Sequence, residues 1–503
     1  MTLKNEKTLN LISKSSLFIT ISGLISKILA AIYRIPYQNL VGDRGFYAYQ
    51  QIYPLLAIIS ALSLTALPNV VASLCQKNKK EDIQALFVFQ IIMTTLLSLS
   101  LVIFNKEIAV FLGSRQFAPS IIITAVVLLT VPFISIARGF AQAELDMTPT
   151  AVSQVIEQFI RIVIIILAAV CYLIFDWTVY TTANVAACGN LIASLSVLFY
   201  FSKKNLKIDL IKSLIKNVNI TYLTDIGLSS FVFIFFSVYL LLFQFIDALF
   251  IKKTLVESGK IEIVAEITKG IYDRGQPLIQ FGLIFSTAFF TTFLPKLTKD
   301  YYIEKENYMT ESQSFFEFIY YFNTTLSLGF MCILGSMNRF LFEDNNGWLA
   351  LEIYLGTIAL SSFIQFFHQK MFIEENQKKS FIYLSFGLLL KIMLTPILTY
   401  YFSVIGSSLS TVLPLVMILI LYIRETTISL TVCKNRKFIF SLIVMSLTVL
   451  VSQYYLPSRT RLDNLISILV STFSGSVVFL TISKRLKVFE DKLWSYLPFI
   501  NEK

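Results

Sequence analysis

The chain has 503 residues, of which 56% are hydrophobic, and it carries a formal net charge of +11. This apolar content is far above that of water-soluble chains and argues against a soluble enzyme. The basic residues gather in alternate connections between apolar stretches, so positive-inside topology and anionic lipid headgroups explain the charge without a nucleic-acid partner. The five cysteines have no paired spacing and His368 is the only histidine, which argues against disulfide frameworks and His-rich metal sites.

About fourteen apolar stretches have the length of a bilayer-spanning helix, so the sequence predicts an all-α integral membrane protein. The first is too long for a cleaved signal peptide and is expected to be a retained helix. The charge bias and the even number of spans place both termini on the cytoplasmic side. In chain order the predicted spans are 17–33, 46–74, 83–104, 121–140, 152–174, 178–201, 228–251, 278–294, 315–337, 348–367, 381–402, 406–428, 438–456 and 465–482.

Short sequence matches recur about 230 residues apart and indicate an internal repeat. The second predicted span ends in Leu67-Pro68 before a Lys-rich connection, as the eighth ends in Leu294-Pro295. The fourth and tenth also end alike, each with a glutamate before a polar turn. We therefore predict two six-helix lobes in parallel pseudo-repeat, residues 1–205 and 206–432, followed by two appended helices and a tail, 433–503.

Ionisable residues inside the apolar spans are the candidate functional residues, because their burial is costly unless they face a cavity or a partner. The first span carries Lys27 and ends with Arg34. Seven residues make nearly two helical turns, so both cations point the same way and are candidates for one wall of a cleft. Alternatively, Lys27 extends to the membrane interface and Arg34 marks the helix end.

The fifth span contains Glu157 and Arg161, whose spacing of four residues suits an ion pair on one helix face. We interpret them first as a structural pair inside the bundle. The alternative is that Glu157 exchanges a proton or an ion during a transport cycle, with Arg161 lowering the pKa of the carboxyl group between steps.

Asp247 is a lone carboxylate in the seventh span, and burial there is costly without a cation. It is expected either to pair with Lys391 of the eleventh span or to serve as a cation site. The sequence leaves both alternatives open.

The segment 269–280 leads into the eighth span and is the most distinctive motif of the chain. Pro277 suits a first helical turn, and Arg274 and Gln276 stand at the expected helix N-terminus, where free N–H groups favour an anion. A guanidinium there binds phosphate oxygens with two hydrogen bonds, so both residues are substrate-binding candidates. The alternative is a helix cap with a surface pair between Arg274 and Asp273.

The motif Gly-Ile-Tyr-Asp-Arg-Gly-Gln-Pro-Leu-Ile-Gln (270–280), the run Ser-Gln-Val-Ile-Glu-Gln (153–158) and the Leu-Pro span ends resemble the SpoVB/YtgP group of polysaccharide-biosynthesis membrane proteins. This group is related to the MurJ lipid II flippases of the MOP exporter superfamily. The resemblance implies fourteen helices, alternating access coupled to membrane potential or an H⁺ or Na⁺ gradient, and a groove for a polyprenyl tail formed by the last two helices. It also implies that Lys27 and Arg274 bind a pyrophosphate, with Arg34 an approximate match to a further cation.

The function that follows from this resemblance is transport of an undecaprenyl-pyrophosphate-linked glycan, in the first place lipid II, across the cytoplasmic membrane, with membrane lipids and envelope-synthesis machinery as partners. No Walker A loop, nucleophile with a base, metal cluster or cofactor motif is present, so the sequence predicts a protein that is not an enzyme. The alternatives are a cation-coupled exporter of drugs or metabolites of the same superfamily, a flippase for another envelope polysaccharide precursor, and a membrane glycosyltransferase or polymerase.

Overall fold

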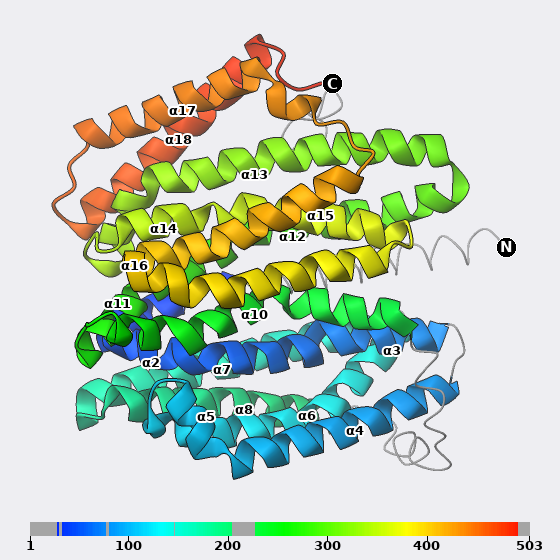
Figure 1. Cartoon of the computed structure of the whole chain (residues 1–503), viewed down its shortest axis with the longest axis vertical. Helices are drawn as coiled ribbons and strands as arrows, with labels where there is room; N and C mark the ends of the chain where they lie inside the picture. Colours follow the sequence, from blue (N-terminus) through cyan, green and yellow to red (C-terminus); the bar gives the residue numbers. More distant parts are fainter. Residues whose placement is uncertain (1–27, 30–32, 77–79, 145, 204–226, 491–503) are drawn as a thin grey trace. The chain divides into compact units, whose positions relative to one another are not determined.

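The computed structural model describes residues 28–29, 33–76, 80–144, 146–203 and 227–490, and within these ranges every regular element is a helix (Figure 1). Twelve helical stretches of the described residues are long and apolar enough to cross a membrane. The predicted all-α membrane fold is therefore confirmed. The first predicted span, 17–33, lies almost wholly outside the described residues, and the count of fourteen stays a prediction.

Most of the described helices follow one another after connections of a few residues, as expected of a bundle. In chain order they are α2 (Arg34–Ala61), the π-helical turn η1 (Leu62–Ala66), α3 (Leu67–Gln76), α4 (Lys80–Ile103), α5 (Asn105–Phe111), the 3₁₀ turn η2 (Arg115–Phe117), α6 (Ala118–Ala143), α7 (Thr148–Phe175), α8 (Val179–Lys203), α10 (Gly227–Glu257), α11 (Glu262–Asp273), α12 (Gly275–Ile303), α13 (Lys305–Phe342), α14 (Trp348–Leu355), α15 (Thr357–Ile373), α16 (Gln377–Glu425), the 3₁₀ turn η4 (Thr431–Lys434), α17 (Arg436–Tyr455) and α18 (Arg461–Arg485).

Contacts divide the chain into two compact units. The first unit contains the described residues up to Asp273 together with the segment Lys391–Ser403, and the second contains Arg274–Leu390 and the described residues from Val404 onward. This division follows contacts within the chain, whereas the lobes predicted from the sequence follow a repeat. The lobe boundaries at residues 205 and 432 stay predictions.

In the first unit, α2 is a helical hairpin and not a straight rod. The hydroxyl groups of Tyr33 and Tyr49 lie 2.8 Å apart although 16 residues separate them. A straight helix would hold their backbones about 24 Å apart, beyond the reach of two tyrosine side chains. The chain reverses at Gly42, whose φ of 69° and ψ of 179° interrupt the helix, and a residue without a Cβ adopts this conformation without strain.

Helix α11 packs against this hairpin through Gly270. A Cβ atom at Gly270 would lie 2.1 Å from the backbone carbonyl oxygen of Asp43. Nearby, the Arg44 Nε donates to Glu266 Oε2 at 2.7 Å, which adds an ion pair between the same two helices. Close backbone approach and this ion pair fix α11 on α2.

We expect Gly270→Ala to destabilise the first unit. The new methyl group must push backbone aside, and overpacking of this kind costs about 1–3 kcal/mol. Thermal unfolding of the purified protein in detergent should show a lower midpoint. Gly329→Ala is the matched control, because a Cβ at Gly329 meets nothing within 4 Å; equal midpoints for the two variants would contradict the packing argument.

Helix α16 is 49 residues long, about 74 Å, far more than the hydrocarbon core of a bilayer. It is interrupted at Ser403, where φ is 52° and ψ is −141°. The interruption falls between the predicted spans 381–402 and 406–428. The structure therefore divides this helix where the sequence predicts two separate spans.

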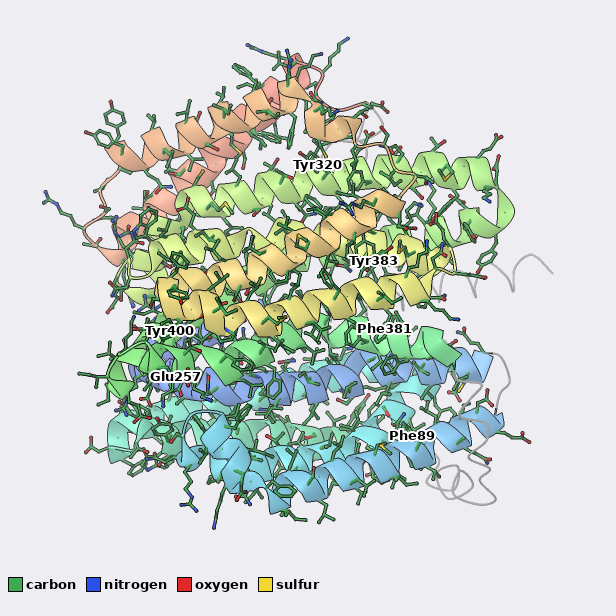
Figure 2. The ribbon with its side chains drawn as sticks, in the orientation of Figure 1. Phe89, Glu257, Tyr320, Phe381, Tyr383 and Tyr400 are labelled. Carbon is green, nitrogen blue, oxygen red and sulfur yellow. The ribbon has the colours of Figure 1, made fainter. Side chains whose placement is uncertain are left out.

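The second unit is packed largely by aromatic side chains. Phe289 of α12 stacks edge-on against Phe318 of α13 with ring centres 4.7 Å apart, and Phe293 and Phe315 lie equally close. In the first unit, outward-facing positions are also apolar: Phe89 on α4 and Tyr400 on α16, labelled in Figure 2, are 41% and 50% exposed. Apolar residues on both the inner and outer faces are typical of helices that have lipid as their solvent.

Candidate functional site

Arg34 is fully buried at the start of α2, among tyrosines of the hairpin. The carbon atom of its guanidinium lies 4.1 Å from the centre of the Tyr53 ring and 5.9 Å from that of Tyr33. Contacts of this kind stabilise a buried cation through the negative faces of the rings. Lys27 lies outside the described residues, so the wall that it would form with Arg34 stays a prediction.

Glu157 and Arg161 of α7 form the ion pair that their spacing predicts, and Arg138 of α6 completes a buried cluster. Arg161 Nη2 donates to Glu157 Oε1 at 2.6 Å, and Arg138 Nη2 donates to Glu157 Oε2 at 2.8 Å. The Ser60 hydroxyl also donates to Oε1 at 2.8 Å. With three donors on one carboxylate, the geometry favours the structural interpretation over proton exchange.

Arg138 is the member of this cluster that the sequence analysis missed. It also donates from Nε to the Ser153 hydroxyl at 2.9 Å and from Nη1 to the carbonyl of Ser63 at 3.1 Å. Ser63 lies in η1, where the backbone departs from α-helical hydrogen bonding. The signal was present, because Arg138 is an ionisable residue inside the predicted span 121–140.

Asp247 of α10 pairs with Lys391 of α16, both within the first unit, and both side chains are buried. The second carboxylate oxygen of Asp247 accepts a hydrogen bond from the Tyr272 hydroxyl of α11 at 3.0 Å. Of the two alternatives that the sequence left open, the structure places Asp247 with Lys391. A second buried pair, Lys269 with Asp273 at 2.6 Å, follows on α11.

In the second unit, Arg274 immediately precedes α12 and is buried. Its Nη1 and Nη2 donate to the two carboxylate oxygens of Asp344 at 2.7 and 2.9 Å, and its guanidinium lies 5.0 Å from the centre of the Phe342 ring. The expected position at a helix N-terminus is observed. Asp273, the alternative partner, pairs with Lys269 within the first unit, and its pairing with Arg274 stays a prediction.

Asp344 lies in the connection after α13 and is partly exposed. Burial raises the pKa of its carboxyl group, but hydrogen bonds from Arg274 and from the backbone amide of Asn346 outweigh burial and hold the pKa below its ordinary value. A lowered pKa means that the pair contributes fully above the pKa of the unfolded chain and is lost only as the pH falls through the folded value. The two-pronged grip on a carboxylate is the geometry that also suits a phosphate.

Gln276 follows in the first turn of α12 and is buried. Its side-chain amide donates to the hydroxyl of Tyr354 on α14. Gln276 and Arg274 thus belong to the second unit, whereas Arg34 belongs to the first. Their roles in substrate binding stay predictions.

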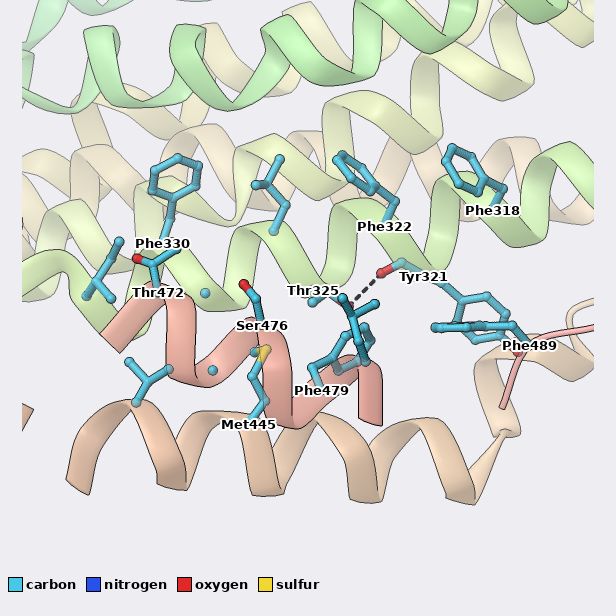
Figure 3. Close-up of a pocket in the computed structure, with 16 residues that line it drawn as sticks. Phe318, Tyr321, Phe322, Thr325, Phe330, Met445, Thr472, Ser476, Phe479 and Phe489 are labelled. Atoms are coloured by element: carbon cyan, nitrogen blue, oxygen red, sulfur yellow. Dashed lines mark hydrogen bonds between the residues drawn. The ribbon is translucent and has the colours of Figure 1, made fainter. Parts of the chain in front are cut away.

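A cavity of about 310 Å³ lies among α13, α17 and α18 in the second unit (Figure 3). The Thr325 hydroxyl, one of its few polar groups, donates to the Tyr321 carbonyl of its own helix at 2.8 Å, so it offers the cavity little unmet hydrogen bonding. The lining side chains are mostly apolar and include Phe318, Phe322, Phe330, Met445, Val449, Phe479 and Phe489. Helices α17 and α18 correspond to the last two predicted spans.

Among the side chains that the structure describes, no group of three or more His, Cys, Asp or Glu residues is placed to hold a metal ion. The charged residues brought together inside the helices form ion pairs with one another. Chemically, the arrangement offers buried guanidinium and ammonium groups, each with a carboxylate or aromatic partner, and an apolar cavity.

This all-α membrane fold is similar to those of solved membrane proteins. The solved structure of lipid II flippase MurJ in an inward closed conformation matches with a TM-score of 0.67, 14% identity, and coverage of 95% of this chain and 98% of that one. An inward-facing multidrug resistance MATE transporter matches with a TM-score of 0.61, 13% identity, and coverage of 79% and 93%. At these identities the likeness concerns the fold.

The chain belongs to the polysaccharide biosynthesis protein family, whose model matches residues 12–299. It is 32% identical to the uncharacterized membrane protein YabM of Bacillus subtilis over 68% of this chain and 66% of that protein. It is 24% identical to lipid II flippase MurJ of the same organism over 57% of this chain and 58% of that protein. The matches span less than two thirds of these relatives. The resemblance to the MurJ-related group is confirmed.

Proposed function

We propose that the protein is a flippase that moves an undecaprenyl-pyrophosphate-linked glycan, in the first place lipid II, across the cytoplasmic membrane by alternating access. The observation that carries this proposal is the apolar cavity among α13, α17 and α18. A volume of about 310 Å³ with apolar walls gives room for part of a hydrocarbon chain. A lipid tail fits such a lining, whereas a hydrophilic solute does not.

The headgroup requires cations, because a pyrophosphate cannot enter hydrocarbon without replacing its hydration. Arg274 supports this part of the proposal: it already holds a carboxylate with two parallel hydrogen bonds, and Asp344 stands in for the oxygens of a phosphate. Lys27, Arg34 and Gln276 are the further headgroup ligands in this proposal. In this proposal the protein transports the lipid without covalent chemistry, and membrane potential or an H⁺ or Na⁺ gradient drives the transport. Both termini lie in the cytoplasm.

A second candidate is a cation-coupled exporter of drugs or metabolites. The buried Asp247 carboxylate favours it, because a carboxylate inside the membrane is a common site of ion coupling. Its pairing with Lys391 supports the flippase instead, since the ammonium group already neutralises that carboxylate. Dye efflux from intact cells separates the two functions.

The experiment that tests the proposed function is complementation of cells conditionally depleted of their lipid II flippase. Growth and the exposure of lipid II on the outer face are measured together, and membrane insertion of the protein is checked by blotting. Rescue of both readouts is expected. A properly inserted protein that restores neither would contradict lipid II as the substrate and favour another polyprenyl-linked precursor or efflux.

Filling the cavity should slow transport without unfolding the protein. Gly329 lines the cavity, and a Cβ there meets nothing within 4 Å, so Gly329→Phe projects a ring into open space. We expect at least a roughly tenfold loss of lipid exposure at an unchanged thermal midpoint, because the ring occupies the volume of the tail. Gly329→Ala should transport normally; equal transport by both variants would exclude the cavity as a tail site.

A further inference from the structure

The segment Lys391–Ser403 is the part of α16 that belongs to the first unit, while the stretches before and after it belong to the second. Lys391 is the only charged residue in this segment. Its side chain is completely buried, and its ammonium group donates to Asp247 of α10. The ion pair between Lys391 and Asp247 therefore lies where the chain enters the first unit.

The other end of the segment is also held by a lysine. Lys260, in the connection between α10 and α11, donates from Nζ to the Ser403 hydroxyl at 2.9 Å. Tyr272 of α11 donates to the second oxygen of Asp247 at 3.0 Å. The hairpin formed by α10 and α11 thus contacts both ends of the segment through polar groups, Lys391 at one end and Ser403 at the other.

A permanent attachment would not need these groups. Well-packed apolar side chains hold helices together at least as well as a buried ion pair, because the desolvation of two charges offsets most of their attraction. In a membrane-spanning segment the same cost makes ionisable residues rare and functional by default. An ion pair differs from apolar packing in one respect. When the contact opens, each charged side chain can be hydrated or can pair with another charge, so the open state is also stabilised.

The backbone provides a hinge at the end of the segment. Ser403 has a φ of 52° and a ψ of −141°, a strained conformation that non-glycine residues rarely adopt. Pro396, inside the segment, has no N–H group to donate to the preceding turn. The hydrogen bonding of helix α16 is therefore interrupted at Pro396, inside the segment Lys391–Ser403, and its helical geometry is interrupted at Ser403, where the segment ends.

We propose that Asp247, Lys391 and Tyr272, together with the contact between Lys260 and Ser403, form a releasable clasp that opens and closes the Lys391–Ser403 segment against the α10–α11 hairpin during transport. The proposal rests on the transport cycle proposed above. The Lys269–Asp273 pair of α11 interacts electrostatically with the clasp: Lys269 acts on Lys391, and Asp273 acts on Asp247 and on Arg34 of α2. Opening the clasp therefore changes the electrostatic potential at Arg34, a candidate ligand of the pyrophosphate headgroup.

The first part of the test measures the position of the segment directly and needs no substrate. In a variant without the five native cysteines, spin labels at Glu257→Cys and Phe402→Cys report the distance between α10 and the segment, at positions 55% and 56% exposed. The full-length protein in lipid nanodiscs should show a short distance with a minor longer one, on the order of a tenth of molecules or fewer. Lys391→Met should make the longer distance dominant and lower transport at least roughly tenfold.

Three further variants control the result. The charge swap Asp247→Lys with Lys391→Asp should restore the short distance, and Lys106→Met, at an exposed position of α5, should change nothing. Ser403→Ala removes the second contact without leaving a buried charge, so it decides the matter if Lys391→Met fails to fold. A single, unchanged distance in folded Lys391→Met or Ser403→Ala would overturn the clasp. Failure of the unaltered protein to move lipid II, with the distances behaving as expected, would count against the proposed substrate alone.

Discussion

Replacing Glu157 by glutamine should lower the free energy of unfolding by about 3–5 kcal/mol. The substitution keeps the size of the side chain but removes the carboxylate charge that pairs with two buried guanidinium groups, those of Arg138 and Arg161. Arginine does not lose its proton in a protein, so both positive charges stay inside the bundle without compensation. Denaturant unfolding in detergent micelles, followed by intrinsic fluorescence, measures the change.

The same experiment separates the two interpretations of Glu157. If Glu157 exchanged a proton during transport, glutamine would mimic its protonated state and the fold would tolerate it. The control Glu107→Gln, on exposed α5, should change the free energy of unfolding by less than about 0.5 kcal/mol. Adding Arg161→Met to Glu157→Gln should recover part of the loss, because it removes one uncompensated charge. A loss below about 1 kcal/mol in Glu157→Gln would refute the structural interpretation.

The helices were largely predictable because apolar length is a local property. A helix as long as α16 does not fit one bilayer, so the sequence predicts two spans there. The break at Ser403 falls between these two spans. Glu157 and Arg161 were predictable for the same reason: four residues on one helix face bring the side chains together whatever surrounds them. The pair between Asp247 and Lys391 was open to prediction because both are isolated opposite charges in apolar spans.

Partners on different elements were harder to predict. Asp344 lies 70 residues after Arg274 in a polar connection, where a carboxylate needs no partner, so nothing in the sequence singled it out. Arg138 also lies in an apolar span, but its pairing with Glu157 was not predicted because Glu157 already had Arg161 as a partner four residues further on. The reversal at Gly42 falls between the predicted spans 17–33 and 46–74, but the apolar pattern does not reveal that the turn depends on a φ of 69° at one glycine.

Replacing Arg274 by alanine should abolish transport while leaving the protein folded. The loss of function is expected because alanine offers no hydrogen bonds to phosphate oxygens. It cannot replace the two parallel hydrogen bonds that the Arg274 guanidinium makes. The fold should survive because the released carboxylate of Asp344 is 36% exposed and can be hydrated. Lipid II exposure in flippase-depleted cells measures function, and the thermal midpoint measures folding.

Two variants show whether the geometry or only the charge of Arg274 matters. Arg274→Lys keeps the charge but loses the planar fork, so we expect transport to fall by roughly tenfold or more. Asp344→Asn removes the carboxylate that competes with phosphate for the guanidinium and should leave transport intact or raise it. If Arg274→Ala moves lipid II at the rate of the unaltered protein, Arg274 does not bind the headgroup, and its grip on Asp344 serves only to join α12 to the end of α13.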